Sequence, residues 1–229
     1  MAPTPTPEDM AGCLEVEAEK IENGEYEKVT GLELVKEYVR LYDTLDEFQK
    51  KDQTQIAWAV ANNHEFIVRL LLKSTKVNPN DRDAAGRTAL SRLAGNGHVY
   101  MAKLLLQSPK VGVTIPDKQG RTPLLWAAAK GRLEIVQLLL MAEAKPHVAD
   151  KKGRTPFLIA AANGRRRVVS LLLSLTTVDA NVVDNEGRTA VLWAQQSGHA
   201  GIVKLLDPTG NVTSVHHRIS SALEAVRQG

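Results

Sequence analysis

Histidines and aspartates that recur at regular spacing are the residues of this sequence best suited to acid–base chemistry. They are His64, His98, His199, Asp117, Asp150 and Asp184. Each histidine follows an asparagine or a glycine, and each aspartate stands three residues before a glycine. Asp-x-x-Gly is a turn pattern, which accounts for the aspartates without a catalytic role. Gly-x-Ser-x-Gly, His-Glu-x-x-His and phosphate-binding glycine loops do not occur, so we expect neither a catalytic site nor a cofactor.

The cysteine and histidine content argues against a metal site. Cys13 is the only cysteine, so a disulfide within the chain is impossible and a zinc site built on thiolates is not expected. The pair His216 and His217 is isolated from other ligand-type residues. We therefore expect no bound metal, and the cysteine content suits a reducing compartment.

Lysines and arginines are the other residues that could recognise a ligand. Residues 1–50 carry 13 Asp and Glu against 5 Lys and Arg, whereas residues 51–229 carry 13 against 24. The net charge is therefore −8 in the first segment and +11 in the second. This asymmetry favours an anionic partner for the second segment. An acidic protein surface fits better than nucleic acid, because aromatic residues for base stacking are not interleaved with the charges.

A repeat of 33 or 34 residues positions these side chains. Copies of Asp-x-x-Gly-Arg-Thr begin at Asp83, Asp117, Asp150 and Asp184. Ten residues after each arginine lies another glycine, and a Leu-rich block follows it. The threonine suits a helix N-cap, the second glycine suits a left-handed helix end, and the Leu-rich block reads as a second helix. The sequence predicts pairs of short helices joined by projecting turns such as 77–83, 111–117 and 178–184.

This pattern resembles the ankyrin repeat over roughly residues 50–207. Thr122-Pro123-Leu124 carries the Thr-Pro-Leu element of the family, and Thr155-Pro156-Phe157 is a close variant. The resemblance implies an all-α ankyrin-repeat solenoid of about five repeats, of which the first is degenerate and has Asn63 in place of the helix-ending glycine. The expected repeats are 51–82, 83–116, 117–149, 150–183 and 184–207.

The chain departs from the family directly after Thr-Pro-Leu, where ankyrin repeats commonly carry histidine. The residues at this position are Ala57, Ser91, Leu125, Leu158 and Leu192. We expect apolar packing to replace the hydrogen bonds of that histidine. Tryptophans stand one residue further on at Trp58, Trp126 and Trp193. They resemble a variant frequent in fungal ankyrin arrays, and we expect them to pack between repeats.

The two ends of the chain do not follow the repeat. Residues 1–7 are expected to form a disordered Pro/Thr tail, residues 8–50 an acidic helical N-terminal cap, and residues 208–229 a C-terminal capping helix. An open end of a repeat array needs such a cover. The alternative for residues 8–50 is a partner-binding or self-binding arm. A further hypothesis is that the acidic segment folds back onto the basic array and competes with an acidic partner, in which case deletion of residues 1–50 would tighten partner binding.

In ankyrin proteins the turns and first helices form a concave binding face. Carried over by position, the residues expected to bind a partner are Lys118, Gln119, Arg121, Lys130, Lys151, Lys152, Arg154 and Asn163. Arginine before the threonine is common in the family and can pair with a nearby aspartate, so Arg121 and Arg154 also have a structural interpretation. The resemblance implies a non-catalytic protein–protein interaction scaffold or adaptor that holds a partner with an acidic surface.

Two other classes of function stay open at this point. An enzyme could have a pocket on the concave face near Trp126 and Trp193, and a nucleic-acid-associated regulator could use the basic surface, although no DNA-reading motif occurs. The N-terminus lacks the charged and apolar regions of a signal peptide, and no apolar run approaches the ~20 residues of a membrane span. We therefore expect a cytoplasmic or nuclear protein that contacts no membrane.

Overall fold

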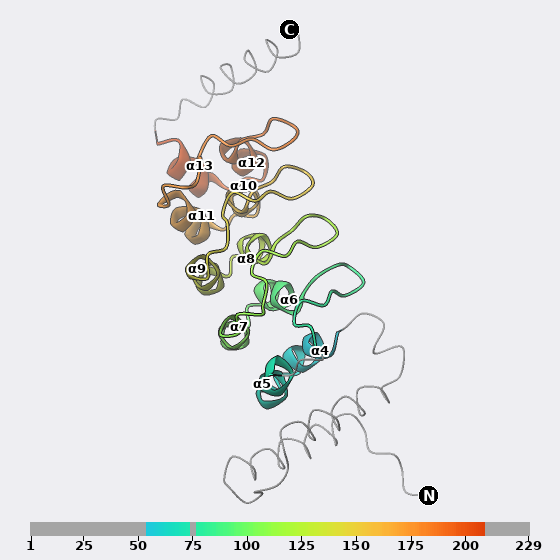
Figure 1. The fold of residues 1–229 in the computed structure, drawn as a ribbon. Helices are drawn as coiled ribbons and strands as arrows, with labels where there is room; N and C mark the ends of the chain where they lie inside the picture. Colours follow the sequence, from blue (N-terminus) through green and yellow to red (C-terminus); the bar gives the residue numbers. More distant parts are fainter. Residues whose placement is uncertain (1–53, 74–76, 209–229) are drawn as a thin grey trace, which may run out of the picture. The chain divides into compact units, whose positions relative to one another are not determined.

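The computed structural model describes residues 54–73 and 77–208, and within these ranges the regular structure is entirely helical. The helices are labelled α4 to α13 in Figure 1. This confirms the all-α prediction. The predicted tail at residues 1–7, the predicted cap at residues 8–50 and all but the first residue of the predicted C-terminal helix lie outside the described residues.

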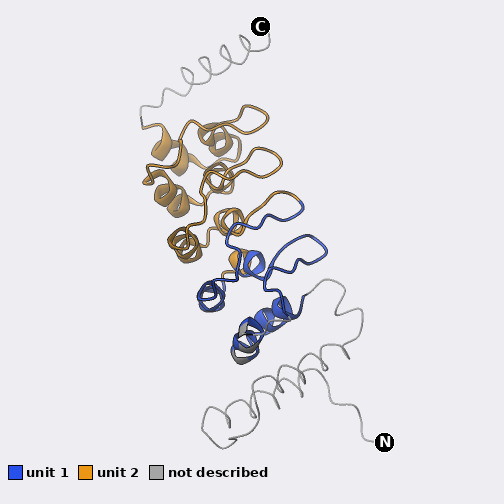
Figure 2. Ribbon diagram, viewed as in Figure 1, with its two compact units in different colours: residues 1–93, 98–118 blue, residues 94–97, 119–229 orange. Residues whose placement is uncertain are grey.

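The chain divides into two compact units (Figure 2). Among the described residues, unit 1 comprises 54–73, 77–93 and 98–118, and unit 2 comprises 94–97 and 119–208. Unit 1 contains α4 (Gln55–Ala61), α5 (Glu65–Lys73), α7 (Val99–Leu106) and the start of α6 (Ala89–Asn96). Unit 2 contains α8 (Pro123–Lys130), α9 (Leu133–Met141), α10 (Pro156–Ala162), α11 (Arg166–Leu173), α12 (Ala190–Gln196) and α13 (Ala200–Leu206).

Helices pair in chain order within each unit, and the pairs stack in sequence. In unit 1, α4 packs on α5, and α5 packs on α7. In unit 2 the pairs are α8 with α9, α10 with α11, and α12 with α13, and α10 lies between α8 and α12. Figure 1 shows the first helices of unit 2 as one row and the second helices as another, with the projecting turns beside the first row.

Each first helix begins at a threonine, as the sequence predicts. The hydroxyl oxygens of Thr122 and Thr155 accept hydrogen bonds from the backbone N–H three residues ahead, at 3.3 and 3.4 Å, and proline occupies the start of both helices. Such a cap contributes about 1 kcal/mol. At the other end, Gly131 caps α8 in the left-handed conformation with a φ of 74°. Asn63 takes the same conformation with a φ of 61°, as expected of the residue that replaces glycine in the first repeat.

The core of each unit is built mainly from Leu, Ile, Val and Ala, with Met101 in unit 1 and Phe157 in unit 2. Leu125 and Leu158 stand where the family commonly has histidine, and both are fully buried. Burial of a leucine side chain stabilises the fold by roughly 1.5–3 kcal/mol. Apolar packing therefore fills this position, as expected from the sequence. Ser91 differs, because its hydroxyl oxygen accepts a hydrogen bond from that of Thr88 at 3.3 Å.

Candidate functional site

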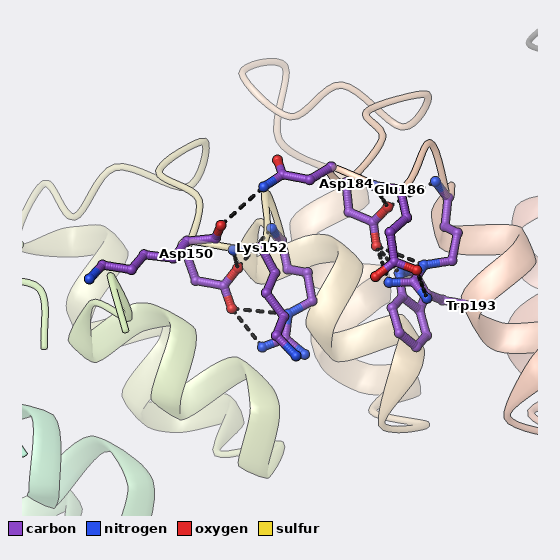
Figure 3. A network of polar contacts seen from close by, with 9 residues as sticks. Asp150, Lys152, Asp184, Glu186 and Trp193 are labelled. Carbon is purple, nitrogen blue, oxygen red and sulfur yellow. Dashed lines mark hydrogen bonds and ion pairs between the residues drawn. The ribbon is translucent and has the colours of Figure 1, made fainter. Parts of the chain in front are cut away.

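The projecting turns are organised by buried aspartates. The Asp150 side chain, only 7% exposed as a residue, accepts backbone N–H groups of Lys152 and Arg154 on one oxygen, at 2.9 and 3.0 Å. Its other oxygen accepts the Arg154 guanidinium through Nε at 3.0 Å and Nη2 at 2.7 Å. Figure 3 shows this carboxylate inside the turn. Arg154 was expected either to bind a partner or to pair with a nearby aspartate. These contacts show that it pairs with Asp150.

The same arrangement recurs at Asp184 with an additional donor. One oxygen accepts the backbone N–H groups of Glu186 and Arg188, and the other accepts Arg188 Nε at 2.9 Å and Trp193 Nε1 at 3.0 Å. Burial alone would raise the pKa of Asp184. The hydrogen bonds from Arg188, Glu186 and Trp193 outweigh that effect and hold the pKa below its ordinary value of 3.8.

The tryptophans of unit 2 lie beneath arginines of their own repeats. The guanidinium carbon of Arg121 lies 4.0 Å from the centre of the Trp126 ring, and Arg188 lies 4.0 Å from that of Trp193. A cation over an indole face is a favourable contact. Trp126 also approaches the neighbouring repeat, because a Cβ atom added at Gly95 would lie 3.6 Å from its ring. Packing between repeats was expected, whereas the stacking within a repeat was missed.

The tips of adjacent turns are joined through main-chain atoms. In unit 2 the N–H of Lys151 donates to the carbonyl of Gln119 at 2.9 Å, and the N–H of Asn185 donates to that of Lys152 at 3.1 Å. The side chains of Gln119, Lys151 and Lys152 are exposed. In unit 1 the N–H of Lys118 likewise donates to the carbonyl of Ala85 at 3.1 Å, and the Lys118 side chain is exposed. The lysines of the tips are thus accessible, because the fold contacts of Lys118, Lys151 and Lys152 described here use their backbone atoms.

Two expected binding residues, Lys130 and Asn163, lie at the opposite end of the first helices. Lys130 is the last residue of α8, and Asn163 is the C-cap of α10. A helix of eight residues is about 12 Å long, which separates these ends from the turns. The Asn163 amide donates to the carbonyl of Ile159 at 2.7 Å, and Asn62 makes the same bond to Trp58 in unit 1. Asn163 therefore has a helix-capping role that accounts for its residue type.

Residues that follow the helix-ending glycines bridge successive repeats of unit 2. Arg132 Nε donates to the carbonyl of Gly95 at 3.3 Å, and Arg165 Nε donates to that of Ala129 at 3.1 Å. The imidazole of His199 hydrogen-bonds through Nε2 to the carbonyl of Ala162 at 3.2 Å. This contact gives His199 a structural role between successive repeats.

An exposed polar cluster lies on the second helices of unit 1. The Arg69 guanidinium pairs with Glu65 at 2.6 Å. A hydrogen bond from the Tyr100 hydroxyl, together with the contacts of Arg69, lowers the pKa of Glu65. The carboxylate in turn raises the pKa of Tyr100, whose side chain projects into solvent. The sequence did not indicate this cluster, since its members stand on two helices.

Within residues 54–73 and 77–208, no group of three or more His, Cys, Asp or Glu side chains is arranged to hold a metal ion. No helix in the described part of the chain has both the length and the apolar content to cross a membrane.

The sequence also matches a known family. The family model described as "Ankyrin repeats (3 copies)" matches residues 28–117, 56–150 and 140–215, which together span most of the chain. No curated protein sequence matches the chain. Ankyrin repeats are in general protein-binding scaffolds, and proteins built from them are typically non-catalytic. The stacked helix pairs, the aspartate turns and this match agree, and the chain belongs to the ankyrin-repeat family.

Proposed function

We propose that this chain is a non-catalytic adaptor that binds an acidic protein surface through the turn tips of unit 2. The observation that carries the proposal is the pair of exposed lysines, Lys151 and Lys152, at a tip whose fold contacts are made by backbone atoms and by Asp150. Turn geometry requires no lysine at either position, so their charge is available to a partner.

Charge is concentrated at this tip. The next tip carries Glu186, which pairs with Arg188 at 2.7 Å. The preceding tip offers the uncharged Gln119 in unit 2. A partner that places a carboxylate at this tip would meet the two cations of Lys151 and Lys152. Exposed ion pairs contribute about 0.2–1 kcal/mol each, so we expect charge to govern association rate and specificity more than affinity.

A photo-crosslinking experiment tests the proposal. The change Gln119→p-benzoylphenylalanine puts a crosslinker at the tip, and Lys204→p-benzoylphenylalanine puts one on α13, away from the turns. Each protein is irradiated in lysate of the source cells, and crosslinked proteins are identified by mass spectrometry. We expect a partner captured from position 119 and not from position 204.

Charge reversal supplies the decisive comparison. In the background of the position 119 crosslinker, Lys151→Glu with Lys152→Glu should abolish capture, whereas Lys145→Glu with Lys204→Glu should preserve it. All four lysines are exposed, so both double variants make the same charge change. Equal capture by both double variants, or equal capture from positions 119 and 204, would refute binding at the turn tips. Circular dichroism checks that each variant is folded.

A further inference from the structure

Four arginines that have no carboxylate partner in the described part of the chain stand at the starts of the second helices α9 and α11 of unit 2. We define the helix-end surface as Lys130, Arg132, Arg165, Arg166 and Arg167. Elsewhere, Arg87, Arg154 and Arg188 are held by aspartates. Within residues 54–73 and 77–208, the four arginines of the helix-end surface form no ion pair. All five side chains of the surface are exposed.

The guanidiniums of Arg132 and Arg165 are held in place by the fold. Each donates through Nε to a carbonyl of the preceding repeat. Each also lies across a glycine, because a Cβ atom added at Gly131 would come within 2.7 Å of Arg165 Cδ, and one at Gly97 within 2.9 Å of Arg132 Nε. The ordering of two long side chains is thus already achieved before a ligand binds, which lowers the entropic cost of binding.

The fold does not require arginine at this position. His199 occupies the equivalent place in the last repeat, lies across Gly164 and makes the same bridge to the preceding repeat through one ring nitrogen. Arg132 and Arg165 therefore bring a positive charge and further N–H donors beyond those that the bridge uses. These groups are available to a ligand.

One acidic residue, Glu134 in the first turn of α9, stands close in sequence to this surface, and the positive charge on α11 is opposed by helix electrostatics. Segments 129–133 and 162–168 contain no acidic residue, and α11 has none in its first turn. Arg166 and Arg167 stand in that first turn, where the helix dipole disfavours cations. A bound anion would relieve this repulsion.

We propose that the helix-end surface binds a phosphorylated segment of a partner protein. Four arginines favour phosphate, because the planar guanidinium presents paired N–H donors that match phosphate oxygens. Arg132 and Arg165 belong to repeats whose helices α8 and α10 pack together, at a spacing of about 8–10 Å. An extended peptide advances about 3.3 Å per residue. The segment therefore carries phosphates about three residues apart. This site is distinct from the turn tips and stands or falls independently of them.

Fluorescence anisotropy with the full chain tests the proposal. The probe is a fluorescein-labelled Gly/Ser peptide with two phosphoserines three residues apart, compared with the same peptide bearing serine or glutamate. We expect the phosphopeptide to bind at least tenfold more tightly than either control. Arg166→Gln with Arg167→Gln should weaken binding roughly tenfold, whereas Lys151→Gln with Lys152→Gln at the turn tip should change it less than twofold.

A second variant separates guanidinium geometry from charge. Arg132→Lys with Arg165→Lys keeps both charges but loses the paired donors, and we expect weaker binding of the phosphopeptide after folding is checked by circular dichroism. Wild-type affinity in this variant, or in Arg166→Gln with Arg167→Gln, would overturn the proposal. So would equal binding of the glutamate peptide, or tighter binding of a single-stranded oligonucleotide that competes with the phosphopeptide.

Discussion

Replacement of Asp184 by asparagine probes how strongly a buried aspartate holds a turn. Asparagine has the same shape, and its carbonyl oxygen can still accept the N–H groups of Glu186 and Arg188. The second oxygen becomes an NH₂ group, which faces the donors of Arg188 and Trp193. Asp184→Asn therefore removes a charge and creates donor–donor conflict at a residue that is only 4% exposed.

The size of the effect follows from these contacts. Hydrogen bonds to charged groups contribute about 1.5–3 kcal/mol, and loss of one partner of a buried ion pair costs about 3–5 kcal/mol. The Arg188 side chain is 21% exposed, so water partly replaces the lost partner. We expect Asp184→Asn to lower the free energy of unfolding by about 2–4 kcal/mol. Urea denaturation followed by circular dichroism measures this change.

The pH dependence gives the same prediction a second test. Because the pKa of Asp184 is lowered in the fold, the stabilisation is present above the ordinary value of 3.8 and is lost as the pH falls through the folded pKa. The difference in free energy of unfolding between the wild type and Asp184→Asn should therefore become smaller below about pH 4. The control is Asp179→Asn, whose exposed carboxylate accepts one local N–H. The reasoning would be refuted if Asp184→Asn lowered the free energy of unfolding by less than about 0.5 kcal/mol and by no more than the control does.

Two further predictions concern backbone strain and an exposed hydrogen bond. Gly153→Ala should destabilise the protein by about 2 kcal/mol or more in urea denaturation. Gly153 has a φ of 75°, which alanine adopts only with strain, and a Cβ atom at this position would lie too close to the Asn185 backbone nitrogen, at 2.7 Å. A Cβ atom added at Gly201 in α13 would have no neighbour within 4 Å, so Gly201→Ala should instead stabilise the protein by up to about 1 kcal/mol. Equal effects of the two substitutions would contradict the argument. Glu65→Gln should lower the pKa of Tyr100 toward 10.0, because the carboxylate that accepts its hydroxyl is lost. An unchanged ultraviolet titration of tyrosine ionisation would show that this bond does not form in solution.

The turns could be predicted from the sequence because their contacts are local. Asp83, for example, accepts the N–H groups of Ala85 and Arg87, two and four residues ahead. Residue types at fixed short spacing therefore determine the geometry. The N-caps at Thr122 and Thr155 were predictable for the same reason.

The surroundings of the candidate site could not be predicted in the same way. The stacking of Arg121 on Trp126 depends on the directions of two side chains, one before and one inside a helix. The bridges from Arg132 and Arg165 reach carbonyls in the preceding repeat, at sequence separations of 37 and 36. Lys130 lies at the end of α8, as its place in the repeat predicts, and whether it shares a binding face with the turn tips stays a prediction.

The main-chain links between turn tips have a consequence for how this protein can change over evolution. Since Lys151 is joined to Gln119, and Asn185 to Lys152, through N–H and C=O groups, almost any residue other than proline can make these bonds. If the tips bind a partner as proposed, the Lys151 and Lys152 side chains would serve recognition while the backbone atoms of the same residues serve the fold. Substitution of the Lys151 and Lys152 side chains should therefore leave the stability of the repeats nearly constant.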